Sequence, residues 1–334
     1  MNNADTIQSE DLTMLNIYRY PKNNSVNNYN KNNHENSCRG MTYHQSSEKT
    51  VDFHYYIQEK YLDHLGLIND LQTCLEKDDL NICYQPLIDL GTGQPTSVEA
   101  LIRWQHKLAG SISPEIFIPL AEQTGHIHAL TFWVLNRTLQ QLRAWKSDNI
   151  DIDVAVNLSM FNLHDEGFPS QVCRLLDKWS ISPEQLILEI TEGVIMYNPE
   201  QAIRILENLN DIGIRLALDD FGAGYSSLGH LSRLPISELK IDRSLIMDID
   251  KNHKNAMIVR STIELAQELG LKIVAEGVEN ATVCDILREY GCNSVQGFFF
   301  SKPVNDVEFK SWFMNNCRTA CNPPLYFKAE PVRI

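Results

Sequence analysis

The sequence predicts an α/β protein folded as a modified (β/α)8 barrel behind an Asn-rich extension. Short runs rich in β-branched and aromatic residues alternate with segments of helical periodicity, which is typical of βα units around a parallel sheet. About eight such runs fall within about 260 residues, the usual size of a closed barrel. The first run is not followed by a GxGxxG fingerprint, so a doubly wound dinucleotide-binding sheet is disfavoured.

The predicted strands are short apolar segments separated by turn residues. They span residues 81–90, 96–104, 152–159, 185–191, 215–220, 238–242, 272–277 and 293–300. The first two strands follow each other across the Gly-Thr-Gly turn at 91–93, with no helix between them. The barrel is therefore expected to depart from a regular one at its first unit.

Helical periodicity marks the segments between most of these strands. The predicted helices are 114–125, 129–146, the stretch after Pro199, 257–270 and 281–291. A further amphipathic helix is predicted from Tyr55 onward, where apolar residues recur at helical spacing: Ile57, Tyr61, Leu65, Ile68, Leu71 and Leu75. Such a helix either packs on the barrel or pairs two subunits.

The composition is that of a globular chain with an atypical first part. Of the 334 residues, 43% are apolar and 22% are charged, which is enough to build a core. The stretch Asn23–Asn36 has too little apolar content to contribute to one. We therefore expect a disordered or weakly structured extension at 1–54, a barrel with its leading helix at 55–320 and a tail at 321–334.

Charge and hydropathy restrict the partners of the chain. The formal net charge of −14 disfavours a nucleic acid polymer as partner, because its phosphates need a basic face. No apolar run reaches the roughly 18 residues of a membrane span, and the polar N-terminus lacks the apolar centre of a signal peptide. The cysteines form no CxxC pair, so reduced thiols are expected. These features predict a cytoplasmic protein.

Polar or ionisable residues stand at the ends of most predicted strands. Taken singly, Asp219 and Asp220 are interpreted as turn residues. In a barrel, however, the carboxyl ends of all strands meet at one face, so these side chains are expected to share a single cleft. The set consists of Glu99, Asn157, Glu189, Glu192, Asp219, Asp220, Lys240, Asp242, Glu276, Glu279 and Gln296.

This set has the composition of a site for hard metal ions. Carboxylates in one cleft repel one another unless cations neutralise them, and oxygen ligands without His or Cys favour Mg²⁺ or Mn²⁺ over Zn²⁺. The adjacent Asp219 and Asp220 suit a pair of ions that hold a phosphodiester and activate water. Lys240 either positions that water or serves as a salt-bridge partner. Arg103 is either a phosphate clamp or an ordinary surface arginine.

The ordered motifs of the chain resemble those of a known family. They are YQPLIDL, VEALIRW, FIPLAEQTG, VNLS, LEITEG, LALDDFGAGYSSL, LPISELKIDRSLI, IVAEGVEN and QGFFFSKPV, between Leu67 and Phe313. In this order they resemble the EAL-domain family of bacterial cyclic-di-GMP phosphodiesterases. The resemblance implies a modified TIM barrel that hydrolyses cyclic di-GMP to linear pGpG with two Mg²⁺ or Mn²⁺ ions.

The resemblance also implies roles for individual residues. The first ion would be bound by Glu99, Asn157, Glu189 and Asp219, and the second by Asp219, Asp220 and Glu276. Lys240, Glu276 and Asp242 would take part in catalysis by holding or deprotonating water and orienting nearby groups. Gln85, Arg103 and Gln296 would contact the substrate, and Glu192 and Glu279 would support the loop 219–227.

Other readings stay open beside an active phosphodiesterase. A non-catalytic cyclic-di-GMP receptor would bind the nucleotide without product, and a regulator would act by protein contact through the extension or the helix from Tyr55. The resemblance also implies a homodimer and, for the family as a whole, control of biofilm formation and motility.

Overall fold

The protein is represented by a computed structural model that describes residues 64–191, 193, 198–223, 231 and 233–317. The predicted extension 1–54, the first part of the leading helix, Glu192 and the tail 321–334 lie outside the described residues. So does most of the loop that follows Asp220. The predicted segment boundaries at 54/55 and 320/321 therefore stay predictions.

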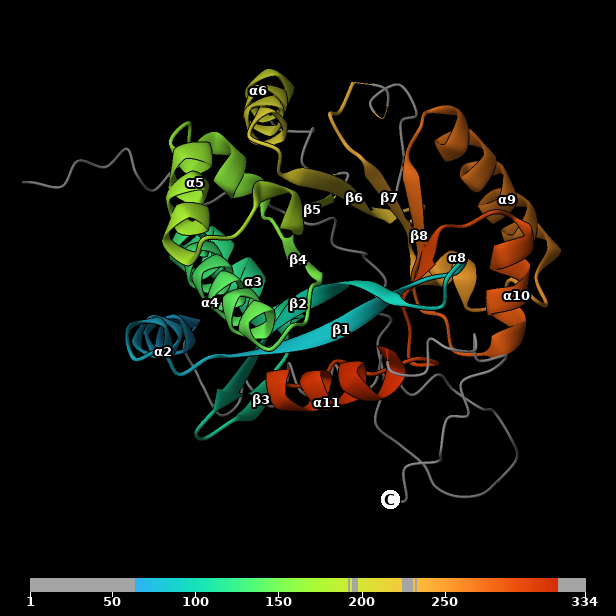
Figure 1. Cartoon of the computed structure of the whole chain (residues 1–334). Helices are drawn as coiled ribbons and strands as arrows, with labels where there is room; N and C mark the ends of the chain where they lie inside the picture. Colours follow the sequence, from blue (N-terminus) through green and yellow to red (C-terminus); the bar gives the residue numbers. More distant parts are fainter. Residues whose placement is uncertain (1–63, 192, 194–197, 224–230, 232, 318–334) are drawn as a thin grey trace, which may run out of the picture. The chain divides into compact units, whose positions relative to one another are not determined.

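Eight strands close into a barrel (Figure 1). Their order is β1-β9-β8-β7-β6-β5-β4-β2, and β1 also pairs with β2, which closes the ring. Six consecutive pairs from β2 to β9 are parallel, whereas β1 runs antiparallel to both of its neighbours. The strands are β1 (Asn81–Asp89), β2 (Pro95–His106), β3 (Gly110–Ile112), β4 (Asp153–Asn157), β5 (Leu186–Thr191), β6 (Arg215–Phe221), β7 (Glu238–Ile241), β8 (Lys272–Ala275) and β9 (Ser294–Val295). The modified (β/α)8 barrel is confirmed.

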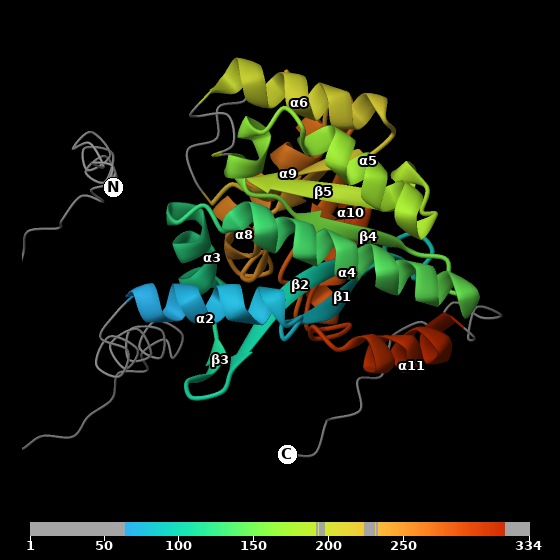
Figure 2. The ribbon, with the colours of Figure 1, turned by 90° about the vertical axis from the view of Figure 1, so that its left-hand side faces the viewer.

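Helices surround the barrel (Figures 1 and 2). They are α2 (His64–Glu76), α3 (Pro114–Gln123), α4 (Ile127–Ser147), α5 (Phe168–Trp179), α6 (Pro199–Asp211), α8 (Arg243–Ile246), α9 (His253–Glu268), α10 (Ala281–Glu289) and α11 (Asp306–Cys317), with short 3₁₀ helices at Met160–His164 and Pro183–Gln185. The described part of the leading helix, α2, packs on α3 and α4. This agrees with the expectation that the leading helix packs on the barrel. None of the described helices combines the length and apolar character needed to cross a bilayer.

Some elements differ from the sequence-based expectation. The strand predicted at 293–300 is limited to β9, and the chain turns away at Gly297. A Cβ at Gly297 would lie 2.0 Å from the carbonyl oxygen of Val278, so this segment passes too close to its neighbour for any side chain. Helices α5, α8 and α11 and the short strand β3 were not predicted.

The core has two parts, because alternate strand residues face opposite sides of the barrel wall. Residues facing outward pack under the helices and form the main apolar core. Residues facing inward include Ala155, Ile187 and Ala217, which form a separate buried apolar cluster. This small layer fills the barrel interior between two polar ends. We call these the carboxyl mouth, where the parallel strands end, and the amino mouth, where they begin.

Candidate active site at the carboxyl mouth

The carboxyl mouth brings together most of the polar residues predicted from the strand ends. Glu189 and Asp219 lie near the ends of β5 and β6, and Lys240 lies on β7, while Glu276 directly follows β8. Asn157, the last residue of β4, is the register partner of Glu189. The parallel register thus converts positions far apart in the sequence into one cluster.

Lys240 lies at the centre of this cluster. Its side chain is only 1% exposed, and its Nζ lies 2.7 Å from Glu276 Oε1 and 2.8 Å from Glu189 Oε1. The same atom lies 3.2 Å from Asp219 Oδ1 and 3.9 Å from Glu99 Oε2. One buried ammonium is therefore shared among four carboxylates, which is more than a single salt bridge requires.

Glu99 is oriented by two side-chain amides. Asn157 Nδ2 donates to Glu99 Oε1 at 2.7 Å, and Gln296 Nε2 donates to Glu99 Oε2 at 2.7 Å. The same Nε2 donates to Gln85 Oε1 at 3.0 Å. Each oxygen of the Glu99 carboxylate thus has its own donor, which fixes the rotation of the carboxylate plane.

A break in β6 explains how two adjacent aspartates serve one site. Successive residues of a regular strand face opposite sides, so Asp219 and Asp220 would normally point apart. The β6–β7 register shifts between Leu218 and Phe221, and Asp220 adopts a left-handed conformation with φ of 58°. As a result, carboxylate oxygens of Asp219, Asp220 and Glu276 lie within 4.8 Å of one another.

Lys240 and Glu99 are held in their charged forms. Burial alone would lower the pKa of Lys240, but the surrounding carboxylates, Glu189 foremost, raise that pKa well above its ordinary value. Burial would raise the pKa of Glu99, yet the Lys240 ammonium and the hydrogen bonds from Gln296 and Asn157 bring it below its usual range. These two groups form the ionised centre of the site.

The other carboxylates carry the opposite shift. Burial raises the pKa of Glu276 to about 8 and that of Glu189 well above its ordinary value, and neighbouring carboxylates add to both effects against the pull of Lys240. Burial, followed by repulsion from Asp219 and Asp242, also raises the pKa of Asp220. The mouth contains more negative charge than its lysine balances, so it favours either protons or further cations.

The donor set fits divalent cations of the hard class. Asp219, Asp220 and Glu276 supply an all-oxygen group of the size that a metal ion needs, and the neighbouring ligand atoms are oxygens as well. The excess negative charge would be relieved by such ions. The structure thus supports a possible acidic metal-binding group at this mouth.

A cleft of about 210 Å³ opens beside this cluster. Among the predicted residues, Gln85, Glu99, Asp219, Glu276, Glu279 and Gln296 line it. Arg103 is not among the described lining residues, and its Nη1 donates to the carbonyl oxygen of Ile102 at 2.9 Å. Asp242 caps α8 by accepting from the Ser244 amide at 2.9 Å. The functional roles predicted for these residues stay predictions.

The sequence analysis missed some lining residues of the cleft. Arg243, Met247, Leu101 and Phe298 contribute to its wall, and Arg243 is the cation among the described lining residues. Arg243 follows Asp242 directly in the LPISELKIDRSLI motif. A search for basic residues just beyond the strand ends, as well as at them, would have found it.

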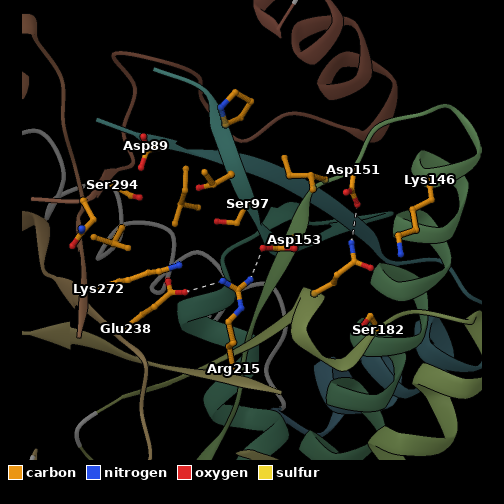
Figure 3. Close-up of a pocket in the computed structure, with 17 residues that line it drawn as sticks. Asp89, Ser97, Lys146, Asp151, Asp153, Ser182, Arg215, Glu238, Lys272 and Ser294 are labelled. Atoms are coloured by element: carbon orange, nitrogen blue, oxygen red, sulfur yellow. Dashed lines mark hydrogen bonds and ion pairs between the residues drawn. The ribbon is translucent and has the colours of Figure 1, made fainter. Parts of the chain in front are cut away.

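The amino mouth contains a larger hollow of about 650 Å³ (Figure 3). There Arg215 Nη1 lies 3.3 Å from Glu238 Oε1, and Arg215 Nη2 contacts Asp153 Oδ2 at 2.5 Å. Gln185 Nε2 donates to Asp151 Oδ1 at 3.1 Å. These residues provide a reference for the carboxyl mouth, because Asp153, Arg215 and Glu238 lie on β4, β6 and β7, the strands that also bear Asn157, Asp219 and Lys240.

Comparison with known proteins agrees with this geometry. The EAL domain family matches residues 68–303 of the chain. The chain is 42% identical over 243 residues to the bifunctional diguanylate cyclase/cyclic di-GMP phosphodiesterase MucR of Pseudomonas aeruginosa, covering 72% of this chain and 36% of MucR. It is 38% identical over 291 residues to the cyclic di-GMP phosphodiesterase NbdA of the same organism, covering 86% of this chain and 37% of NbdA.

The fold is similar to a solved structure described as the PaMucR phosphodiesterase in complex with c-di-GMP. The TM-score is 0.69 at 41% identity, and the match covers 73% of this chain and 99% of that chain. The chain spans little more than a third of the length of the two curated relatives. The EAL domain model covers most of the barrel, and the chain therefore belongs to the EAL domain family.

Proposed function

We propose that the chain is a cyclic-di-GMP phosphodiesterase that converts cyclic di-GMP to linear pGpG with two divalent ions, Mg²⁺ or Mn²⁺, in the cytoplasm of a bacterium. The observation that carries the proposal is the convergence of Glu99, Asn157, Glu189, Asp219 and Glu276 around Lys240. Family membership supports the reaction, since relatives over this region are named cyclic di-GMP phosphodiesterases.

Two overlapping groups of oxygen ligands would hold the ions. Glu99, Asn157, Glu189 and Asp219 would bind one ion, and Asp219, Asp220 and Glu276 would bind the other. When bound, the ions supply Lewis-acid activation of water and neutralise charge on the phosphodiester. The 4.8 Å clustering of the Asp219, Asp220 and Glu276 oxygens supports the second group.

The reaction requires water and no other co-reactant. A water oxygen forms a new bond to one phosphorus atom, the P–O3′ bond of that phosphodiester breaks, and the departing 3′ oxygen takes a proton. Lys240 and Glu276 would hold the water together by hydrogen bonds, and the 2.7 Å between Lys240 Nζ and Glu276 Oε1 supports this joint role. The Lys240 ammonium would also offset the negative charge that develops on the phosphoryl oxygens.

The cleft wall would bind the rest of the substrate. Gln296 Oε1 is buried and accepts no hydrogen bond from the described residues, so it is available to a donor on the ligand. Arg243 would contact a phosphate, while Met247 and Phe298 offer apolar surface to a base. The substrate contact of Arg103, the orienting role of Asp242 and the loop support from Glu192 and Glu279 remain further predictions.

The test is incubation of the purified chain with cyclic di-GMP and Mg²⁺ or Mn²⁺, with products resolved by chromatography. Glu99→Ala should abolish formation of pGpG while the thermal unfolding curve stays cooperative. Glu238→Gln is the matched control, because Glu238 is a buried glutamate at the amino mouth and should leave turnover intact. Hydrolysis by Glu99→Ala at the unsubstituted rate would overturn the assignment of the site.

The same assay separates the alternatives. Binding of cyclic di-GMP without product would identify a non-catalytic receptor, and neither binding nor product would leave a regulator that acts by protein contact. A homodimer and a protein partner for the N-terminal extension remain predictions, to be checked by the mass of the particle in solution and by pull-down with the extension deleted.

A further inference from the structure

Gln85 lies on β1, the strand that runs against the rest of the barrel. Because β1 runs antiparallel to its neighbours, its carboxyl end does not lie at the carboxyl mouth. The residue that β1 contributes there, Gln85, comes from the middle of the strand. Gln85 is the direct register partner of Glu99 on β2, and both side chains are buried, with 7% of each residue exposed. In an antiparallel pair, directly opposed side chains lie on the same face of the sheet.

Both functional atoms of the Gln85 amide are used inside the protein. Its Nε2 donates to the carbonyl oxygen of Ser301 at 3.1 Å, and its Oε1 accepts from Gln296 Nε2 at 3.0 Å. The same Gln296 Nε2 donates to Glu99 Oε2 at 2.7 Å. A chain of hydrogen bonds thus runs from the Ser301 backbone through Gln85 and Gln296 to Glu99.

We infer that Gln85 is a positioning residue that acts through Gln296 on Glu99. Gln85 Oε1 gives the Gln296 amide a fixed acceptor, which holds the Gln296 Nε2 where it can also donate to Glu99. Without that acceptor, the hydrogen bond to Glu99 would be the one side-chain contact of Nε2 among the described residues, so the Gln296 amide could swing about it and would no longer fix the Glu99 carboxylate. The inference rests on the proposed function, since it takes Glu99 as a metal ligand.

Other contacts already hold the backbone around Gln85 in place, so its side chain is not needed for that purpose. The segment after β9 is already joined to β1 by two backbone hydrogen bonds, from Tyr84 N to Val304 O at 2.7 Å and from Val304 N to Tyr84 O at 3.0 Å. Strand β1 is further held by its ladders with β2 and β9. The hydrogen bond from Gln85 to Ser301 adds only one more link between these two segments, whereas the hydrogen bond from Gln296 connects Gln85 to Glu99.

The experiment measures Mn²⁺ binding by titration calorimetry on the full chain carrying Gln85→Leu, which removes both amide functions at similar volume. Substitution of a residue that hydrogen-bonds to a metal ligand typically lowers metal affinity by roughly 10- to 100-fold, and we expect a loss of that size for Gln85→Leu. Gln185→Leu is the matched control, because it removes a glutamine hydrogen bond at the amino mouth and should leave Mn²⁺ affinity unchanged. Mn²⁺ affinity of Gln85→Leu equal to that of the unsubstituted chain would overturn the inference.

A double-substitution cycle separates positioning from general damage. If Gln85 acts through Glu99, then Gln85→Leu should add nothing to the loss of affinity already caused by Glu99→Gln, whereas damage to the fold would multiply the two losses. Should Gln85→Leu fail to show cooperative unfolding, Gln85→Asn takes its place, because its amide is one methylene too short to reach both partners.

The outcome is independent of the proposed reaction. Mn²⁺ binding and its cycle are read without cyclic di-GMP, so a chain that binds Mn²⁺ with the expected cycle but forms no pGpG would contradict the proposed function alone. A chain that hydrolyses cyclic di-GMP with additive losses in the cycle would contradict the inference alone. Absence of Mn²⁺ binding by the unsubstituted chain would also overturn the inference.

Discussion

The two mouths of the barrel are built from the same strands, but their charges are arranged differently. At the amino mouth, Arg215 is held by the carboxylates of Asp153 and Glu238, and the acids and bases that line the hollow are nearly equal in number (Figure 3). At the carboxyl mouth, the Lys240 ammonium is shared by four carboxylates, and Arg243 lines the cleft beside them. Among the described residues, the amino mouth thus has acids and bases in nearly equal number, whereas the carboxyl mouth has an excess of acids.

Residues only two positions apart in the sequence can belong to different mouths. On β7, Glu238 belongs to the amino mouth and Lys240 to the carboxyl mouth, and both face the interior because they are two residues apart. Ala155, Ile187 and Ala217 separate the two networks. The position of a charged residue along its strand therefore decides whether it joins the paired charges of the amino mouth or the acidic cluster of the carboxyl mouth.

The largest effect is expected for Lys240→Met at the carboxyl mouth. Without the ammonium, buried carboxylates lose their shared partner, so the metal-free chain should lose about 3–5 kcal/mol of unfolding free energy. Hydrolysis should fall by at least roughly 100-fold, because the variant lacks the group that we propose holds the water and offsets the developing charge. Thermal unfolding in a chelator and pGpG formation would measure the two effects.

The stability of Lys240→Met should also depend on metal. Mn²⁺ should restore more stability to this variant than it adds to the unsubstituted chain, because cations replace the missing positive charge. Equal stabilisation of both chains would show that the carboxylates of this mouth do not need a cation, and the contrast between the two mouths would fail.

Metal affinity should depend on pH at the carboxyl mouth. Burial raises the pKa of Glu276 to about 8, so this carboxyl holds a proton near neutral pH in the metal-free chain, and burial also raises the pKa of Glu189 well above its ordinary value, so both carboxyls release their protons at a higher pH than an exposed glutamate does. Mn²⁺ must displace these protons, so its affinity should rise with pH by about tenfold per unit for each proton released, and the Glu276 contribution should level off above its pKa. Calorimetry in buffers of different protonation enthalpy would count the protons.

The control for this pH dependence lies at the other mouth. Glu238→Gln should bind Mn²⁺ with the same pH dependence, since Glu238 pairs with Arg215 and does not contact the Lys240 cluster. A pH-independent affinity in the unsubstituted chain would contradict the raised pKa values on which the prediction depends.

A smaller effect, on stability alone, is expected for Arg215→Met at the amino mouth. Removal of the guanidinium leaves Asp153 and Glu238 without their partner, and because the Arg215 side chain is 23% exposed, the loss should be about 1–3 kcal/mol of unfolding free energy. Turnover per folded molecule should remain unchanged. A turnover loss as large as that of Lys240→Met would mean that the two mouths are coupled through the apolar layer.

Much of the fold could be predicted, because each element leaves a local pattern. The alternation of apolar runs and helical periodicity predicted all eight barrel strands, and the helix-free turn at 91–93 predicted the irregular first unit. The end of β9 at Val295 could not be predicted, because it depends on the close approach of Gly297 to Val278, a contact between distant segments.

The site was predicted as a set of residues but not as a geometry. The strand-end pattern indicated which carboxylates would meet, since parallel strands bring their ends to one face. It did not indicate that Asp220 takes a left-handed conformation or that Gln85 accepts a hydrogen bond from Gln296. Both features come from tertiary hydrogen bonding and register, which have no signature in a linear pattern.

The smallest effect is expected for Lys272→Met. Lys272 is an exposed residue at the start of β8, four positions before Glu276 on the same run of chain. It lies at the rim of the amino mouth (Figure 3), so its loss should change the unfolding free energy by no more than about 0.5 kcal/mol. Chemical denaturation and pGpG formation would both be measured. If turnover fell while the unfolding free energy stayed the same, the charge of Lys272 would act electrostatically on the carboxyl mouth across the barrel. The buried carboxylates would then be influenced by charges beyond their immediate neighbours.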